Sequence, residues 1–219
     1  METQIGIRGD NFVVLLSDKI VAQSIVKMKH NQDKMKQLNK NNVMSVTGEA
    51  GDVDSFSEYI EANIKLFGLR QNRPLTTSEC AYWTRGTLAE ALRSRSPYNV
   101  NLLIGGFNPN TKKSSLYRID YLSSICEVPF AAHGYTSYFA YSLMDKEYRK
   151  DLTKEEAIKL AIRCVKQLDH RFLVGQPGFI LRVIDEEGIH TYDSQPILEN
   201  GQRSFNFVNV ANNVVVSEA

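Results

Sequence analysis

The sequence is short of cysteine, of net charge and of long apolar runs, and each shortage excludes a class of protein. Its 219 residues include three cysteines and carry a formal net charge of +1. Cys80, Cys126 and Cys164 lie far apart and in no metal-binding spacing, so we expect buried, reduced thiols in a reducing compartment. A net charge so close to zero creates no global field that would recruit nucleic acid or a membrane surface.

No apolar run approaches the roughly 20 residues of a membrane helix. The N-terminus has no basic leader followed by an apolar stretch, so we expect an intracellular protein made without a secretory signal. Linkers rich in Pro, Gly or Ser and internal repeats are also missing from the sequence. The hydrophobic content of 42% is enough for a substantial core.

Apolar periodicity predicts alternating groups of strands and helices. Strands are expected in about 4–16, 20–28, 43–46, 100–130 and 179–192, and helices in about 52–69, 77–92, 136–144 and 154–168. Hairpins dominate the strand groups, so two mainly antiparallel sheets should form, each with a helix pair on its outer face. The expected fold class is α+β, a four-layer α-β-β-α sandwich. The first two helices are expected to pack antiparallel.

The stretch 42–52 combines a short buried strand with a glycine turn. Gly48 and Gly51 mark the turn, and Asp52 or Asp54 can cap the helix that follows. A strand that ends in glycines at a helix N-terminus can direct backbone N–H groups at an anion or a developing oxyanion. The alternative is a plain strand-to-helix connection, and only a nucleophile near the turn would favour a catalytic site.

Two other features have simple structural interpretations. His133 is a lone histidine, which is more often a structural residue than a catalyst. The segment 27–40 contains five lysines and is typical of a solvated hairpin, with a phosphate-binding patch as the less common alternative.

The C-terminal 26 residues, 194–219, are polar and rich in Asn, yet they contain Phe205, Phe207 and the run Val214–Val216. These apolar residues are too many for a plain flexible tail. We therefore expect a sandwich domain over 1–193 and a C-terminal extension over 194–219, in which these residues bury on a neighbouring chain.

A set of local motifs spread over residues 1–193 points to one protein family. They are Met1–Asp18, Asp33-Lys34 leading to Gly48–Asp52, Phe56–Ile60, Arg93–Leu103, Ile119–Leu122, Ala132–Tyr135 and Gly188-Ile189. Together they resemble the β subunits of the 20S proteasome core particle, which have the N-terminal-nucleophile hydrolase fold. The resemblance is to the kind of subunit at the fourth position of the β ring, which lacks peptidase activity in that family.

The resemblance also implies where a catalytic site would lie. Active members use an N-terminal Thr hydroxyl as nucleophile, its own α-amine as base, a lysine, and a glycine N–H that holds the oxyanion. Lys34 and Gly48 match the lysine and the glycine. The nucleophile position matches Glu2, or Met1 in a register shifted by one, and neither is Thr. No propeptide is expected ahead of them.

Other site positions match only in part. Asp18 matches the aspartate that orients the lysine. Tyr135 stands where active members have a serine, and Ser137 follows two residues later. Phe172 and Gly175 replace supporting Asp and Ser residues. The resemblance therefore implies a vestigial scaffold of Asp18, Lys34, Gly48 and Ser137 with no catalytic residue.

Thr3 offers an alternative. If Met1 and Glu2 were removed, Thr3 would become N-terminal and could act as the nucleophile of an active threonine hydrolase. Strand alternation argues against this, because residues 2 and 3 point to opposite faces of a strand. Removal of Met before a residue as large as Glu is also not expected.

The resemblance implies a structural role without cofactor or metal. The partners would be other α and β proteasome subunits, in two seven-membered β rings between two α rings that enclose the chamber for ATP- and ubiquitin-dependent proteolysis. The expected location is cytoplasm and nucleus, with no nucleic-acid or membrane partner. A self-contained hydrolase of the same fold and a soluble binding module are the competing interpretations.

Overall fold

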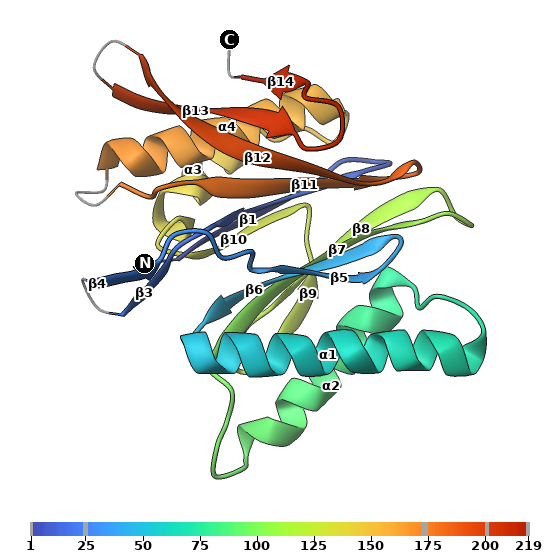
Figure 1. Cartoon of the computed structure of the whole chain (residues 1–219). Helices are drawn as coiled ribbons and strands as arrows, with labels where there is room; N and C mark the ends of the chain where they lie inside the picture. The colour runs from blue at the N-terminus through green and yellow to red at the C-terminus, as the bar shows by residue number, and fades with distance from the viewer. Residues whose placement is uncertain (1, 24–25, 172–174, 200–201, 218–219) are drawn as a thin grey trace.

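Two stacked β-sheets lie between two layers of helices (Figure 1). The computed structural model describes residues 2–23, 26–171, 175–199 and 202–217. The larger sheet has seven strands in the order β10-β1-β2-β11-β12-β13-β14, and the smaller has five in the order β5-β6-β7-β8-β9. Every strand pair in the described residues is antiparallel, so the predicted sandwich is confirmed.

The strands have the following bounds. The larger sheet contains β1 Thr3–Arg8, β2 Val13–Asp18, β10 Phe130–Gly134, β11 Phe179–Asp185, β12 Gly188–Glu199, β13 Gln202–Asn209 and β14 Val215–Val216. The smaller contains β5 Met35–Asn39, β6 Asn42–Gly48, β7 Val100–Asn108, β8 Lys113–Ile119 and β9 Ile125–Glu127. A separate hairpin consists of β3 Val21–Gln23 and β4 Val26–Lys29.

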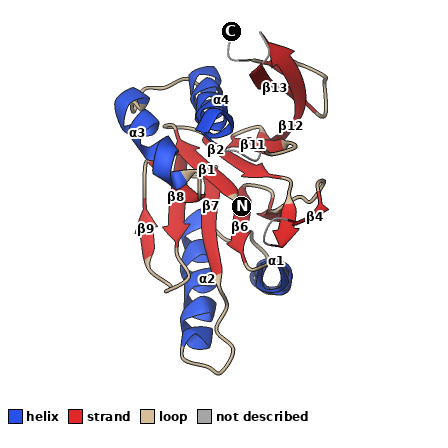
Figure 2. Ribbon diagram, turned by 90° about the vertical axis from the view of Figure 1, so that its left-hand side faces the viewer, coloured by secondary structure: helices blue, strands red, loops and turns tan. Residues whose placement is uncertain are grey.

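Each sheet is covered by one helix pair. Helices α1 (Ala50–Gln71) and α2 (Thr77–Leu92) pack on the five-stranded sheet, and α3 (Ser137–Glu147) and α4 (Lys154–Arg171) pack on the seven-stranded one. Figure 2 shows α1 end-on and α2 lengthwise, so these two helices cross, and the expected antiparallel packing is wrong. The two helices pack on different strands of this sheet: α1 contacts β5 and β6, and α2 contacts β7 and β8.

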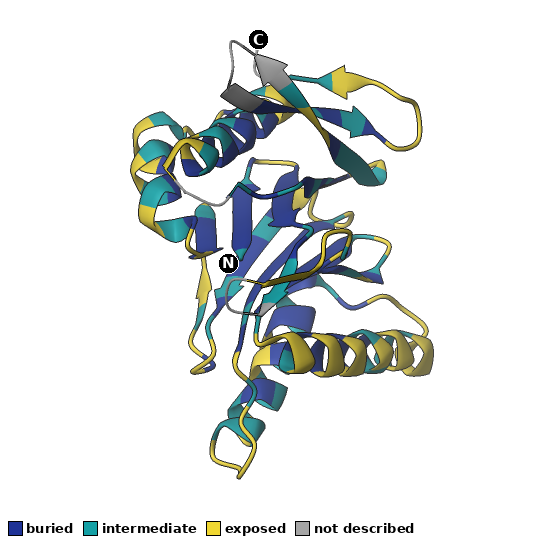
Figure 3. Cartoon of the chain, turned by 60° about the vertical axis from the view of Figure 1, so that its left-hand side comes forward, coloured by how far each residue is buried: buried dark blue, intermediate teal, exposed yellow. Residues whose placement is uncertain are grey.

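Strand alternation divides the core into three layers. On β2, Val14 and Leu16 join the cluster beneath α3 and α4, whereas Val13 and Leu15 face the other sheet. Because side chains of successive residues point to opposite faces, one fully buried strand supplies two cores. Figure 3 shows buried residues concentrated in the sheets and exposed residues on the outer helix faces.

Two of the helices begin with a capping box. Thr76 and Glu79 form the capping box of α2, and Thr153 with Glu156 forms that of α4. Helix α1 instead begins at Ala50, with Glu49 as an N-cap that makes no side-chain hydrogen bond. The expected cap at Asp52 or Asp54 is wrong.

The C-terminal residues extend this chain's own sheet. Strand β12 continues through residues 193 and 194 without a break and pairs with β13. Phe205 and Phe207 are buried in the core beneath α4, and the Phe205 ring contacts that of Phe179 with 5.0 Å between centroids. The expectation that these two residues bury on a neighbouring chain is therefore wrong, since alternation along β13 turns both inward. Val214 and Val215 are exposed.

The three cysteines are free, but only two have the expected environment. Cys80 and Cys164 are buried, and burial raises the pKa of each thiol to about 12. Cys126 is exposed on edge strand β9. Within the described part of the chain, no helix combines the length and the apolar character needed to cross a membrane.

Candidate functional site

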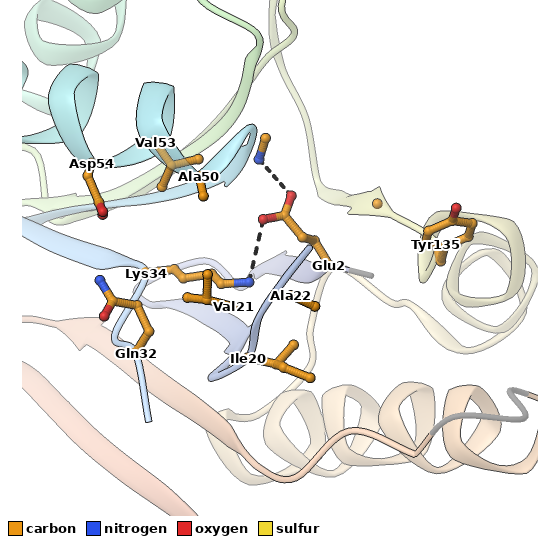
Figure 4. Close-up of a pocket in the computed structure, with 12 residues that line it drawn as sticks. Glu2, Ile20, Val21, Ala22, Gln32, Lys34, Ala50, Val53, Asp54 and Tyr135 are labelled. Atoms are coloured by element: carbon orange, nitrogen blue, oxygen red, sulfur yellow. Dashed lines mark hydrogen bonds and ion pairs between the residues drawn. The ribbon is translucent and has the colours of Figure 1, made fainter. Parts of the chain in front are cut away.

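The side chain of Glu2 lies at the turn where β6 meets α1 (Figure 4). Its Oε2 accepts a 2.6 Å hydrogen bond from the backbone N–H of Gly48. Its Oε1 lies 3.5 Å from the Nζ of Lys34. The N–H that could hold an oxyanion and the ammonium beside it are therefore both in contact with a carboxylate of the same chain.

The backbone at Gly48 requires glycine. Its φ is +150°, and a Cβ there would lie 2.1 Å from the carbonyl oxygen of Asn99. This conformation directs the N–H toward Glu2, while the next N–H, that of Glu49, donates to Asn99 at 3.1 Å. The glycine turn predicted from the sequence thus forms an anion-binding N–H.

Asp18 links Lys34 to the N-terminal strand. Lys34 is only 6% exposed, and its Nζ lies 2.8 Å from the Oδ2 of Asp18. The Asp18 carboxylate also accepts the backbone N–H groups of Thr3 (2.7 Å) and Ile20 (3.1 Å). Because the carboxylate is buried, these donors and the ammonium together offset the cost of removing its charge from water.

Arg182 fixes the segment that carries Lys34. Its guanidinium on β11 contacts the Oδ2 of Asp33 at 2.5 Å and donates to the carbonyl of Met35 at 2.9 Å. The residues on both sides of Lys34 are thus held by the opposite sheet. Nothing in the local sequence signals this contact, since it joins positions about 150 residues apart.

A pocket of about 260 Å³ surrounds these groups. It is lined by Glu2, Ile20, Val21, Ala22, Gln32, Lys34, Gly48, Ala50, Val53, Asp54, Gly134 and Tyr135. Among these described lining residues there is no Ser, Thr or Cys. The lining thus offers polar groups to a ligand, but it contains none of the usual nucleophiles Ser, Thr and Cys.

Burial raises the pKa of the Glu2 carboxyl above its ordinary value of 4.5. Asp18 acts in the same direction, whereas Lys34 and the Gly48 N–H lower the pKa. The largest effect is desolvation, because the charged form loses contact with water. The Gly48 N–H and Lys34 therefore position the Glu2 carboxyl, but they do not outweigh the effect of burial on its pKa.

Thr3 points away from this pocket. Its Oγ1 is buried and accepts hydrogen bonds from Thr136 Oγ1 and Gln176 Nε2, both at 2.8 Å. On the same face of β1, Ile5 and Ile7 pack in the core beneath α3 and α4. The opposite orientations of residues 2 and 3 follow from strand alternation.

Among the other positions singled out by the sequence, Tyr135 lines the pocket, whereas Ser137 and Gly175 do not. The hydroxyl of Ser137 donates to the carbonyl of Gly134 at 2.7 Å, at the start of α3, so it is near the rim but does not line the pocket. The carbonyl of Gly175 accepts from Lys27 at 3.3 Å. Phe172 lies outside the described residues.

His133 is buried, as a structural histidine would be. Burial, followed by the positive charge of Arg118, lowers its pKa to about 4. It also forms a hydrogen bond with the backbone of Leu102. It therefore stays neutral at physiological pH and does not line the pocket.

One group of side chains in the described part of the chain has the composition of a metal site. Asp185, Glu187 and His190 place one ligand atom each within 4.8 Å of the others, at the turn between β11 and β12. The Nζ of Lys154 already lies 2.7 Å from Asp185 Oδ2. A lysine thus supplies the positive charge that this cluster attracts.

Comparison with known proteins identifies the family of this architecture. The family model described as "Proteasome subunit" matches residues 1–184. "Proteasome subunit beta type-4" of Saccharomyces cerevisiae is 41% identical over 193 residues, which is 88% of this chain and 98% of the relative. "Probable proteasome subunit beta type-4" of Neurospora crassa is 41% identical over 189 residues, 86% of this chain and 93% of the relative.

A plant relative carries a different number in its name. "Proteasome subunit beta type-2-A" of Arabidopsis thaliana is 38% identical over 192 residues, 88% of this chain and 93% of the relative. The sandwich with its glycine turn and buried lysine, the family match and these identities agree. The chain belongs to the proteasome subunit family, as a β-type subunit with the N-terminal-nucleophile hydrolase fold.

Proposed function

We propose that this chain is a non-catalytic, structural subunit of the 20S core particle. The observation that supports this most strongly is the carboxylate of Glu2 at the N–H of Gly48. By the family resemblance, the nucleophilic threonine of active members matches Glu2, or Met1 in a register shifted by one. The rest of the site, Lys34 with Asp18, is in place around it.

This arrangement is a poor catalyst for chemical reasons. An oxyanion hole stabilises negative charge that develops on the substrate, and here a carboxylate of the chain already contacts its N–H. Met1 precedes Glu2 in the sequence, so the nitrogen of Glu2 is an amide and cannot act as the base of an N-terminal nucleophile. A carboxylate next to Lys34 would also repel a second negative charge at the same place.

As a structural subunit, the chain would occupy one position, the fourth, in a seven-membered β ring. Two such rings between two α rings would enclose the proteolytic chamber, with the chain as part of the wall. A ring of unlike subunits needs different surfaces on the two flanks of each member. We also propose the cytoplasm and nucleus as its location.

Isolation of the endogenous core particle tests this proposal. Native mass spectrometry with subunit identification should find the chain inside a particle of several hundred kilodaltons. An N-terminal-threonine-directed inhibitor should label other subunits of that particle and leave this chain unmodified. A free monomer near the chain mass of 24.8 kDa, or peptidase activity of the purified single chain, would contradict the proposal.

A further inference from the structure

The turn between β11 and β12 lies at the opposite end of the sandwich from the N-terminus (Figure 1). Asp185 pairs with Gly188 across this hairpin, so the turn itself consists of Glu186 and Glu187. None of these residues lines the pocket around Glu2. A ligand of this turn would therefore be separate from the vestigial catalytic site.

Strand pairing brings three potential metal ligands together at this turn. Because Asp185 lies opposite Gly188, His190 is its diagonal neighbour on the same face of the hairpin. The backbone N–H of Glu187 donates to Asp185 Oδ1 at 2.9 Å, which holds Glu187 beside that carboxylate. One ligand atom of each of the three side chains lies within 4.8 Å of the others. Two carboxylates and an imidazole thus converge from β11, the turn and β12.

The Nε2 atom of His190 lies near both carboxylates without bonding to either. It is 3.4 Å from Asp185 Oδ1 and 3.6 Å from Glu187 Oε2. It is shielded from water and has no hydrogen-bond partner within the part of the chain that the structure describes. Since buried polar atoms are normally partnered, its position between two oxygens indicates a ligand that all three atoms share.

The spacing of these atoms fits a metal ion of the zinc type. Zinc binds carboxylate oxygen and imidazole nitrogen at about 2.0–2.2 Å in tetrahedral geometry, which places neighbouring ligand atoms about 3.4 Å apart. The separations of 3.4 and 3.6 Å from the His190 Nε2 agree with that value. Imidazole nitrogen is also a donor that favours zinc over magnesium or calcium.

Lys154 leaves this position open. Its Nζ lies 2.7 Å from Asp185 Oδ2, which is the carboxylate oxygen farther from the imidazole contact. Oδ1 accepts one hydrogen bond, from the Glu187 N–H, and a carboxylate oxygen has a second lone pair. The lysine therefore orients the carboxylate from outside the site, as hydrogen-bonding groups around metal ligands do. The two carboxylate charges also exceed its single positive charge.

We propose that Asp185, Glu187 and His190 bind one zinc ion, with a water molecule as the fourth ligand. The ion joins the end of β11 to the turn and to β12, and so fixes the hairpin. Its role is structural. Because the three ligands come together only in the folded hairpin, zinc binding stabilises the folded chain.

Zinc chloride titration of the purified full chain tests the site. Cys126 is first blocked with iodoacetamide, because an exposed thiol can itself bind zinc. We expect Zn²⁺ to shift the ¹⁵N resonances of the His190 imidazole in NMR spectra and to raise the midpoint of thermal unfolding. The exposed His30 and His170 should keep their resonances at one equivalent of zinc.

Variants of the full chain identify the ligands. Glu187→Gln and His190→Gln should each weaken zinc binding by about tenfold or more, since loss of even a hydrogen-bonding partner of a metal ligand costs about 10- to 100-fold. Glu186→Gln and His170→Gln are the matched controls, because both side chains are exposed and neither belongs to the cluster. Both controls should bind zinc like the unmodified chain. Thermal unfolding without zinc shows whether each variant folds.

Three outcomes would overturn the zinc site. Binding that is unchanged in both ligand variants would place the ion elsewhere on the chain. The same conclusion follows if zinc does not shift the His190 resonances at any concentration that leaves the chain soluble. A His190 imidazole that stays protonated near neutral pH in the presence of zinc would also contradict the site, because a protonated imidazole cannot bind a metal. All three outcomes leave the proposed function intact.

Discussion

The backbone N–H of Gly48 donates a 2.6 Å hydrogen bond to the side chain of Glu2, across 46 residues of sequence. This contact joins the start of β1 to the end of β6, and therefore one sheet to the other. It also fills, from within the chain, the place where an oxyanion would be held. The group that resembles part of a catalytic site therefore also forms a structural contact between the two sheets.

Replacing Glu2 by Gln should change how stability depends on pH. The pKa of Glu2 is raised by burial, so the folded chain holds this proton more tightly than the unfolded chain. The free energy of unfolding should therefore gain a contribution as pH falls from neutral through the raised pKa to 4.5, the unfolded value. Glu2→Gln cannot titrate and should lack that gain in urea unfolding measured between pH 4 and 7.

The exposed Glu58→Gln is the control for this experiment, because Glu58 lies on the solvent side of α1. It should keep the pH dependence of the unmodified chain. Identical pH profiles for Glu2→Gln and the unmodified chain would show that the Glu2 carboxyl is not held as the structure describes.

Lys34→Met should lower the free energy of unfolding by about 3 kcal/mol, because it leaves the buried Asp18 carboxylate without its ammonium. Adding Asp18→Asn should cost less than the sum of the two single changes, since both remove the same pair. Lys65→Met breaks an exposed pair with Glu61 and should cost about 0.5 kcal/mol or less. Equal losses for Lys34→Met and Lys65→Met in denaturant unfolding would contradict a buried pair.

Gly48→Ala should destabilise the chain by about 2 kcal/mol or more, because the added Cβ meets the Asn99 carbonyl and the φ is unfavourable for alanine. Gly51→Ala, three residues later, should instead stabilise it by about 0.5–1 kcal/mol. Gly51 lies in α1 with nothing within 4 Å of its Cβ position. A Gly48→Ala variant as stable as Gly51→Ala would mean that the turn tolerates a side chain.

Phe205→Ala should cost the isolated chain about 3–5 kcal/mol, because it empties a buried site beneath α4. Val215→Ala, at an exposed position of β14, should change stability by less than about 0.5 kcal/mol. If Phe205→Ala unfolds like the unmodified chain, the C-terminal strands pack elsewhere, as the sequence alone first suggests.

Apolar periodicity predicts most of the sandwich, because the alternation along a strand and the stripe along a helix are local features. Features that depend on contacts between residues far apart in the sequence cannot be predicted from such local patterns. The apolar pattern of Phe205 and Phe207 says that they bury, but not whether they do so on this chain or on another. The crossing of α1 and α2 likewise depends on the strands beneath each helix.

The site could be predicted only in part. The glycine turn at Gly48 is visible in the sequence, but Lys34 is one of five lysines in a segment typical of a solvated hairpin, and only the family resemblance singles it out. The contacts of Glu2 with Gly48 and of Arg182 with Asp33 join segments far apart in sequence. Residue spacing therefore does not predict them. Asp52 has the residue type of a cap, yet its carboxylate accepts the backbone N–H of Asn99 at 2.8 Å.

The most direct test of the central claim is the intact mass of this chain in the native core particle after treatment with an N-terminal-threonine-directed inhibitor. We predict a chain that retains Glu2 and carries no adduct, while other subunits of the same particle are modified. A chain that begins at Thr3 and bears the inhibitor on that residue would contradict the account.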